Sequence, residues 1–274
     1  MFLTFGGGSL RWRGAAWRLA RQARRTEVFA AVVRITDRDL RRSYPTFWDE
    51  HGSFVRRHRR TYGYGLWKPF LVKELMSEYG SEISGILYVD AGCELNSAGN
   101  ALNRLREYLA LGEAKGFLGM ELAASLASWC KPEALAFFDL EDSEGGIPVV
   151  AGGIVAFANN SLGRAVVQEW WDSATALESF LLTDDRRGVE AAAELVAHPY
   201  DQALLSCIVA KYGLHTIQDE TYFSPNWRSD GREFPIWAMR NSLPVSVKPG
   251  TMGALMRRLR NGLRAHRANH GHEA

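Results

Sequence analysis

The chain has 274 residues, 46% of them hydrophobic, which is enough for one large folded core. Its 33 Lys and Arg nearly balance its 31 Asp and Glu, so overall charge does not indicate a nucleic-acid-binding protein. Its three cysteines form no CxxC pair and no 18-residue stretch is wholly apolar, which disfavours a structural zinc site, a disulfide scaffold and a membrane span. The start lacks a secretory signal pattern, and these features together predict a cytoplasmic protein.

The N-terminal segment predicts a strand, a helix and a second strand. Phe2–Phe5 followed by three glycines is typical of a strand and a tight turn, and residues 10–25 have helical spacing. Residues 28–35 predict a second buried strand that ends at Thr36 and Asp37. This order favours an α/β fold with a largely parallel sheet.

Further elements follow along the chain. Pro69 suits the first residue of a helix, residues 83–89 predict a buried strand that ends in Asp90, and Ser97 can cap a helix closed by Gly112. We then expect an excursion from the sheet (116–146), a β-rich segment broken by two glycines (148–157), two helices (161–182 and 199–212) and ordered loops (218–250).

No internal repeat or low-complexity linker divides the sequence. We predict one α/β domain over residues 1–250, with a mostly parallel, Rossmann-like sheet covered by helices on both faces. Residues 251–274 predict a basic amphipathic helix and tail, whose leucines oppose arginines. Such a helix favours peripheral contact with an anionic inner membrane face, although it could instead pack on the domain.

Asp90 stands directly after a buried strand in the stretch ILYVDAGCELN, residues 86–96. In open α/β sheets, ligands bind in the crevice beyond the carboxyl ends of the strands. Mg²⁺ or Mn²⁺ is commonly held there by one or two carboxylates together with substrate phosphates, and Ala91 and Gly92 leave the backbone open to a diphosphate. The alternative is a local turn that Asp90 starts with its own side chain.

Four segments together resemble bacterial glycosyltransferases of the GT-A fold: GYGLWKPFLV (63–72), ILYVDAGCELN (86–96), VVAGGIVAFANN (149–160) and HPYDQALLS (198–206). The resemblance is to polysaccharide-type transferases with a W-K-P signature before a Y-x-D-A-G strand end, and more distantly to the retaining galactosyltransferase and glycogenin superfamily. It covers residues 1–215. It implies a GT-A-like fold and a hexosyltransferase-type enzyme that moves a sugar from a nucleotide donor, most simply a UDP-sugar, to a glycan or lipid-linked acceptor. Retention of configuration and dependence on Mn²⁺ or Mg²⁺ are also implied.

The resemblance also implies roles for single residues. Asp90 lies where the family has a metal-binding aspartate, but Gly92 replaces the usual second aspartate, and Glu94 is the nearest substitute. His198 is a further candidate for a metal or phosphate contact, although a residue before proline can also be a helix cap. The full expected set is Asp201 and Gln202 for catalysis, Phe5, Gly6, Lys68, Asp90, Gly152 and Gly153 for the donor, and Asp90, Glu94 and His198 for the metal.

Sugar transfer gives a physical reason for these roles. Negative charge builds on the leaving phosphate and positive charge on the anomeric carbon, so a cation is needed at the first and oriented dipoles at the second. Asp90 with its metal would meet the first need, and Asp201 and Gln202 the second. Acids and amides are also favoured in the first turn of any helix, which is the alternative for this pair.

Two other classes of protein remain open from the sequence. Gly6 and Gly8 followed by a helix, a strand and Asp37 resemble a dinucleotide-binding unit of an NAD(P)-dependent oxidoreductase, but Arg11 stands where the third glycine belongs. The missing second aspartate leaves room for a non-catalytic GT-A-like domain that binds a nucleotide sugar or glycan.

Overall fold

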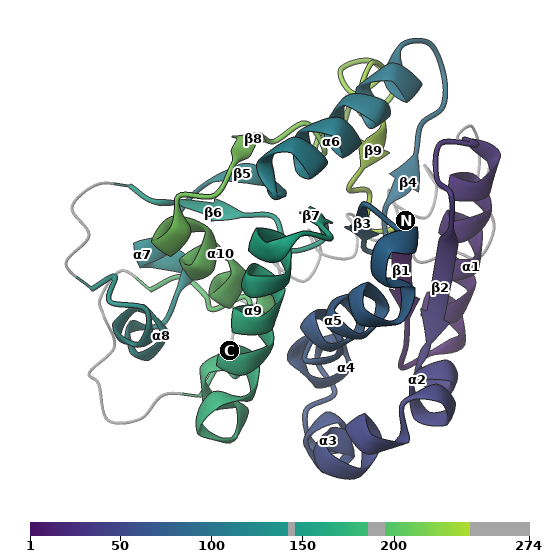
Figure 1. Ribbon diagram of the computed structural model, residues 1–274. Helices are drawn as coiled ribbons and strands as arrows, with labels where there is room; N and C mark the ends of the chain where they lie inside the picture. Colours follow the sequence, from purple (N-terminus) through teal and green to yellow (C-terminus); the bar gives the residue numbers. More distant parts are fainter. Residues whose placement is uncertain (142–145, 186–194, 242–274) are drawn as a thin grey trace, which may run out of the picture.

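A seven-stranded mixed sheet forms the centre of the computed structural model, which describes residues 1–141, 146–185 and 195–241 (Figure 1). The strand order is β2-β1-β3-β7-β5-β6, and β8 also pairs with β5. The strands are β1 (Phe2–Gly6), β2 (Val32–Thr36), β3 (Gly85–Val89), β5 (Phe117–Ser125), β6 (Pro148–Val150), β7 (Ile154–Ala158) and β8 (Thr216–Gln218). β1, β2, β3, β5 and β8 run in one direction and β6 and β7 in the other, which confirms the predicted mostly parallel sheet.

Helices cover both faces of this sheet (Figure 1). They are α1 (Leu10–Arg25), α2 (Asp37–Ser43), α3 (Pro45–Arg57), α4 (Thr61–Tyr64), α5 (Trp67–Tyr79), α6 (Ala101–Lys115), α7 (Leu126–Trp129), α8 (Pro132–Phe137), α9 (Ser161–Ser179) and α10 (Asp201–Tyr212). None of the helices in the described part of the chain is long and apolar enough to cross a bilayer.

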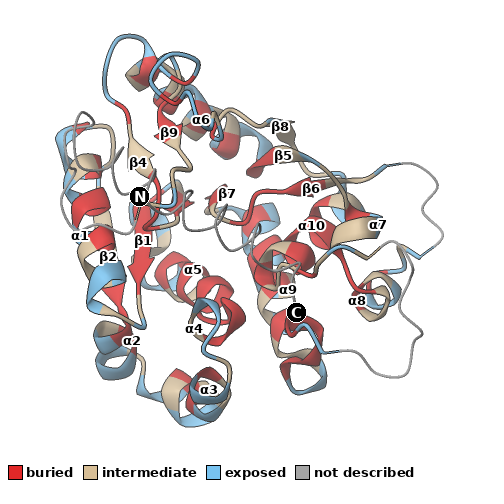
Figure 2. Cartoon of the chain, turned by 180° about the vertical axis from the view of Figure 1, so that it is seen from behind, coloured by how far each residue is buried: buried red, intermediate tan, exposed pale blue. Residues whose placement is uncertain are grey.

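Side chains of the central strands alternate between two cores, as the period of two in a strand requires. In β3, Ile86 and Tyr88 join a core with α5, α9 and α10, whereas Leu87 and Val89 join a second core with α1 and α6. The helix α10 is buried over most of its length, whereas α1 also carries exposed residues (Figure 2). The expected α/β domain with helices on both faces is confirmed.

The first strand and helix pack closely because of the glycine turn between them. A Cβ at Gly6 would lie 2.3 Å from the carbonyl oxygen of Trp12, so only glycine allows α1 to approach β1 this closely. Ser9 then caps α1, with its hydroxyl accepting from the N–H of Trp12. The second strand starts at Val32 instead of residue 28, and Thr36 ends it by capping α2.

Three local predictions were wrong. The expected excursion over residues 116–146 contains β5, a strand paired with β6, β7 and β8, whose residues 117–120 are buried within the sheet. α6 starts after Asn100 instead of Ser97. It continues through Gly112 to Gly116, because the lack of a side chain at Gly112 lets the helix lie against Ala156 of β7.

The segment predicted as ordered loops, residues 218–250, contains a short strand in its described part. β9 (Ile236–Trp237) pairs with β4 (Glu94–Leu95) in a separate two-stranded sheet, and ties this segment to the loop after β3. The basic helix predicted over residues 251–274, and with it the domain boundary at 250, lies outside the described residues.

Candidate active site

Four segments far apart in the sequence meet around the ammonium group of Lys68, on α5. Its Nζ lies 2.5 Å from Oδ2 of Asp201, at the start of α10, and 3.7 Å from Oδ1 of Asp90, which follows β3. The same ammonium donates to the carbonyl oxygen of Gly152, in the turn between β6 and β7, at 2.8 Å. The segments that the sequence singled out therefore form one cluster at the carboxyl end of β3, where α/β sheets bind ligands.

Asp90 is the open carboxylate of this cluster. Its backbone N–H donates to the carbonyl oxygen of Gly153 at 2.8 Å, and its Oδ1 accepts a hydrogen bond from the Tyr88 hydroxyl at 2.5 Å. Its side chain nevertheless keeps 51% of its surface exposed. Asp90 is thus held in a fixed orientation while remaining accessible to a ligand.

The two glycines between β6 and β7 make room for this arrangement. A Cβ at Gly153 would lie 2.5 Å from Oδ2 of Asp90, and one at Gly152 would lie 2.8 Å from Cβ of Gln202. Both distances are too short for any larger residue without movement of the neighbours. The glycines therefore let Asp90 and Gln202 both lie directly against one tight turn.

Lys68 and Asp201 form a buried ion pair. Burial lowers the pKa of Lys68, but the charges of Asp201 and Asp90 outweigh it and hold that pKa above its ordinary value. Burial raises the pKa of the Asp201 carboxyl to about 6, and the Lys68 ammonium limits the rise. At neutral pH the pair is charged. Gly65 adopts a left-handed backbone conformation and has no side chain, which lets the chain pass close to the Asp201 carboxylate.

The two residues predicted for catalysis are placed differently. Asp201 is only 6% exposed and lies behind Lys68, so it reaches a ligand only through that lysine. Gln202 is half-buried, and its side-chain amide makes no hydrogen bond to any residue that the structure describes. Of this pair, Gln202 is the residue with polar atoms available to a ligand.

Phe5 and Gly6 serve packing. The buried ring of Phe5 stacks on Trp67 with ring centroids 3.8 Å apart, and Gly6 lies against α1. Both residues are thus engaged in packing, and a donor contact through this strand and loop would have to come from the backbone.

The three predicted metal ligands do not meet. Glu94 pairs with the buried Arg18 at 3.0 Å and accepts from Asn241 at 2.5 Å. His198 is buried, with Nδ1 accepting from the N–H of Lys131 and Nε2 bonded to the carbonyl oxygen of Leu181. Oε1 of Glu94 and both ring nitrogens of His198 are engaged in these contacts, and the three residues form no metal-binding group in the described part of the chain.

A resident metal centre is therefore not built by these residues. In residues 1–141, 146–185 and 195–241, no group of three or more His, Cys, Asp and Glu side chains could hold a metal ion. A single carboxylate such as Asp90 does fit a hard cation that takes its other ligands from a diphosphate and water. The donor set thus suits a cation that arrives with the substrate.

Asp37, the acid that a dinucleotide-binding interpretation assigns to a ribose, is already occupied. Arg13 binds both of its oxygens, at 2.7 and 2.8 Å, and the carboxylate is buried. Burial raises the pKa of Asp37, but the bonds from Arg13 and from the backbone of Gly8 outweigh it and lower that pKa overall. This geometry opposes the oxidoreductase alternative.

Some residues that shape the site were missed. Arg18 donates to the carbonyl oxygens of Ala91 and Cys93 and so fixes the loop after Asp90, and Tyr88 orients Asp90 itself. Helical spacing gives a signal for Arg18, since it lies beside the buried Ala15 and Leu19 on the inner face of α1. The alternation of residues in its strand predicts that Tyr88 faces a core, but it does not predict the hydrogen bond from the Tyr88 hydroxyl to Asp90.

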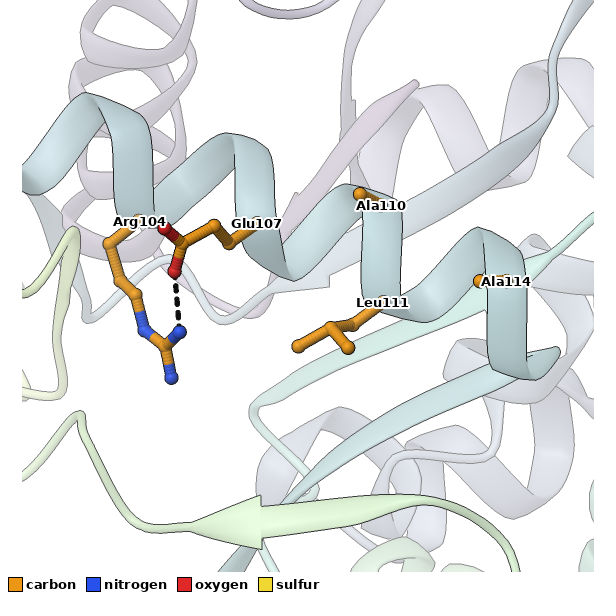
Figure 3. Close-up of a pocket in the computed structure, with 5 residues that line it drawn as sticks. All are labelled: Arg104, Glu107, Ala110, Leu111 and Ala114. Atoms are coloured by element: carbon orange, nitrogen blue, oxygen red, sulfur yellow. Dashed lines mark hydrogen bonds and ion pairs between the residues drawn. The ribbon is translucent and has the colours of Figure 1, made fainter.

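A separate depression of about 460 Å³ lies along α6, on the side toward which Arg104 and Leu111 point (Figure 3). It is lined by Arg104, Glu107, Ala110, Leu111 and Ala114. Arg104 is engaged by Glu107 and by Glu220, at 2.6 and 2.7 Å. The depression contains none of the clustered residues around Lys68, and we assign no function to it.

Comparison with known proteins gave matches at the level of structure. No protein-family model and no curated protein matches the sequence. The chain is similar to a glycosyltransferase involved in the glycosylation of the major capsid of PBCV-1, with 11% identity, coverage of 87% of this chain and 93% of that one, and a TM-score of 0.45. It is also similar to mouse xyloside xylosyltransferase 1 in its apo form, with 12% identity, coverage of 84% and 89%, and a TM-score of 0.44. At these identities and TM-scores, neither similarity assigns an activity to this chain.

Proposed function

We propose that this protein is a glycosyltransferase that takes a sugar from a nucleotide donor and passes it to a glycan or a lipid-linked acceptor. The observation that carries the proposal is the cluster around Lys68, in which Asp90, the Gly152–Gly153 turn and Gln202 meet at the carboxyl end of β3. Two glycines leave the backbone bare beside an accessible carboxylate, which suits a ligand with a bulky diphosphate.

The charges of the site suit departure of a diphosphate. Asp90 would hold a divalent cation brought by the donor, which would neutralise the charge that develops on the leaving phosphate. Lys68 lies 3.7 Å from the Asp90 carboxylate and adds positive charge at the same place. Because Lys68 is buried and bonded on two other sides, it keeps Asp90 in position and preserves the local charge without moving toward the ligand.

Gln202 provides the dipole for the sugar itself. Gln202 packs against the same glycine turn as Asp90, and its amide is not bonded to any described residue, so we assign its oxygen to the electron-poor anomeric carbon while the phosphate is bound at Asp90. Retention of configuration is proposed from the resemblance of Asp201–Gln202 to the D-Q pair of retaining transferases, and a hexose is the proposed sugar. Asp201 then acts as a positioning residue, through Lys68.

The test is an assay of the full chain with UDP-sugars and GDP-sugars, with and without Mn²⁺, that measures release of the nucleoside diphosphate. Asp90→Asn is expected to reduce turnover by about 10²-fold or more, because one preorganised charged group is lost. Asp49→Asn, a change of an exposed carboxylate on α3, is the matched control.

Two outcomes contradict the proposal. Turnover of Asp90→Asn within a few-fold of wild type would remove Asp90 from the reaction. Nucleotide binding without any turnover would favour a non-catalytic binding domain. Proton NMR of the product decides the stereochemistry, and an inverted product would remove the role given to Gln202.

A further inference from the structure

The charge of this protein is unevenly distributed. Residues 1–60 contain fourteen arginines and five acids, although the whole chain carries a formal net charge of only +2. These residues form β1, β2, α1, α2 and α3, which occupy the right-hand and lower side of Figure 1. One side of the molecule is therefore strongly basic, which favours an anionic partner.

The outer face of α1 combines this charge with exposed apolar side chains. Leu10, Trp17 and Arg24 recur at intervals of seven residues and so share one helical face. Leu10 is 77% exposed and Trp17 is 49% exposed, and the Arg21 guanidinium lies 5.4 Å from the centre of the Trp17 ring. No acid occurs in α1, and Glu27 is the first acid after it.

This combination points to a lipid surface. Helices that lie in the plane of a membrane place Trp and Leu at the boundary of the acyl chains and Lys or Arg against the lipid headgroups. Nucleic acid would be attracted by the arginines but gives no reason for a largely exposed leucine on the same helical face as a tryptophan. Each basic residue near an anionic bilayer adds to the attraction, so several on one face act together.

α1 also lies next to the loop that follows Asp90. α1 starts directly after the glycine turn that follows β1, and the ring of Trp12 lies 3.5 Å from where a Cβ of Gly92 would be. Gly92 belongs to the loop after Asp90. Asn241, where the described chain ends, donates to the carbonyl oxygen of Gly92 and accepts from Arg18 of α1.

We propose that the outer face of α1 binds the surface of an anionic membrane, with Leu10 and Trp17 at the lipid interface and Arg21 and Arg25 against phosphate headgroups. This surface is separate from the residues around Lys68 and does not depend on the reaction proposed for them. It is also distinct from the predicted contact through residues 251–274.

The test is sedimentation of the full chain with phosphatidylcholine vesicles, with or without one quarter phosphatidylglycerol, at about 0.1 M salt. Wild type is expected to sediment with the anionic vesicles and to stay in solution with the neutral ones. Arg21→Glu with Arg25→Glu is expected to weaken the association at least tenfold, and Trp17→Ala several-fold. The matched control, Arg106→Glu with Arg228→Glu, reverses two exposed arginines outside the basic side and should stay within about twofold of wild type.

Equal thermal midpoints of all variants would show that the changes do not act through unfolding. Equal weakening by both arginine pairs, absence of binding, or unchanged binding of Trp17→Ala would overturn the proposal. Sedimentation velocity in which wild type is a dimer and Trp17→Ala a monomer would also overturn it, because a second copy of the chain would then cover this face.

Discussion

Replacement of Lys68 by methionine tests the central ion pair of the site. The change removes the ammonium group 2.5 Å from the buried Asp201 carboxylate while keeping a side chain of similar length. Removing one partner of a buried pair leaves an uncompensated charge, which typically costs about 3–5 kcal/mol. For a chain of this size, that loss corresponds to a drop of about 6–20 °C in the thermal midpoint at neutral pH.

The loss should depend on pH in a defined direction. The pKa of Asp201 in the folded protein, about 6, lies above its ordinary value of 3.8, so the folded state binds this proton more tightly than the unfolded chain. The contribution of this tighter proton binding to the free energy of unfolding is fully present below the pKa of Asp201 in the unfolded chain, and it is lost as the pH rises through about 6. Without Lys68 the pKa rises further, so the deficit of Lys68→Met should be small near pH 5 and largest near pH 8.

Urea unfolding of wild type, Lys68→Met, Asp201→Asn and the double variant at pH 5 and pH 8 measures this effect. The double variant is expected to recover much of the loss at pH 8, because no unpaired charge remains. A deficit of Lys68→Met that is the same at both pH values, or a double variant whose loss is the sum of the single losses, would refute the reasoning.

Three further predictions concern the open side of the site. Asp90→Asn should change the free energy of unfolding by no more than about 1 kcal/mol, since the side chain is half exposed, while it removes the Mn²⁺ dependence of nucleotide binding measured by calorimetry. Gly153→Ala should weaken donor binding at least tenfold by displacing Asp90, and Gly146→Ala, where a Cβ meets nothing within 4 Å, should leave it unchanged. Gln202→Ala should lower kcat by about 10²-fold with little change in KM, and an effect on KM alone would show that the amide serves binding only.

Much of the architecture could be predicted because it follows from local pattern. α1 was expected over its observed range, and the strand before Asp90 and the glycine-broken segment that became β6 and β7 were also expected. The strand β5 was missed because its place in the sheet depends on pairing with three distant strands, which no local pattern reveals. The same limit applies to β9, which pairs across the chain with β4.

The candidate site, too, could be predicted from the sequence only in part. The sequence singled out Lys68, Asp90, Gly152, Gly153 and Gln202, and the structure places them together. It could not show which polar atoms are already occupied. Glu94 and His198 have suitable chemistry for a metal, but Arg18 and the backbone of Leu181 engage them through contacts that only the folded chain defines.

The most direct measurement of the central claim is a thermal-shift panel of UDP, GDP, CMP and NADH, each with and without Mn²⁺, on wild type and Asp90→Asn. A ligand at about 100 times its dissociation constant adds about 2.7 kcal/mol, which should raise the midpoint by several degrees. We predict a shift with one nucleoside diphosphate that requires Mn²⁺ and is lost in Asp90→Asn. A shift with NADH alone, or an equal shift in Asp90→Asn, would contradict the assignment of a nucleotide-sugar site to Asp90.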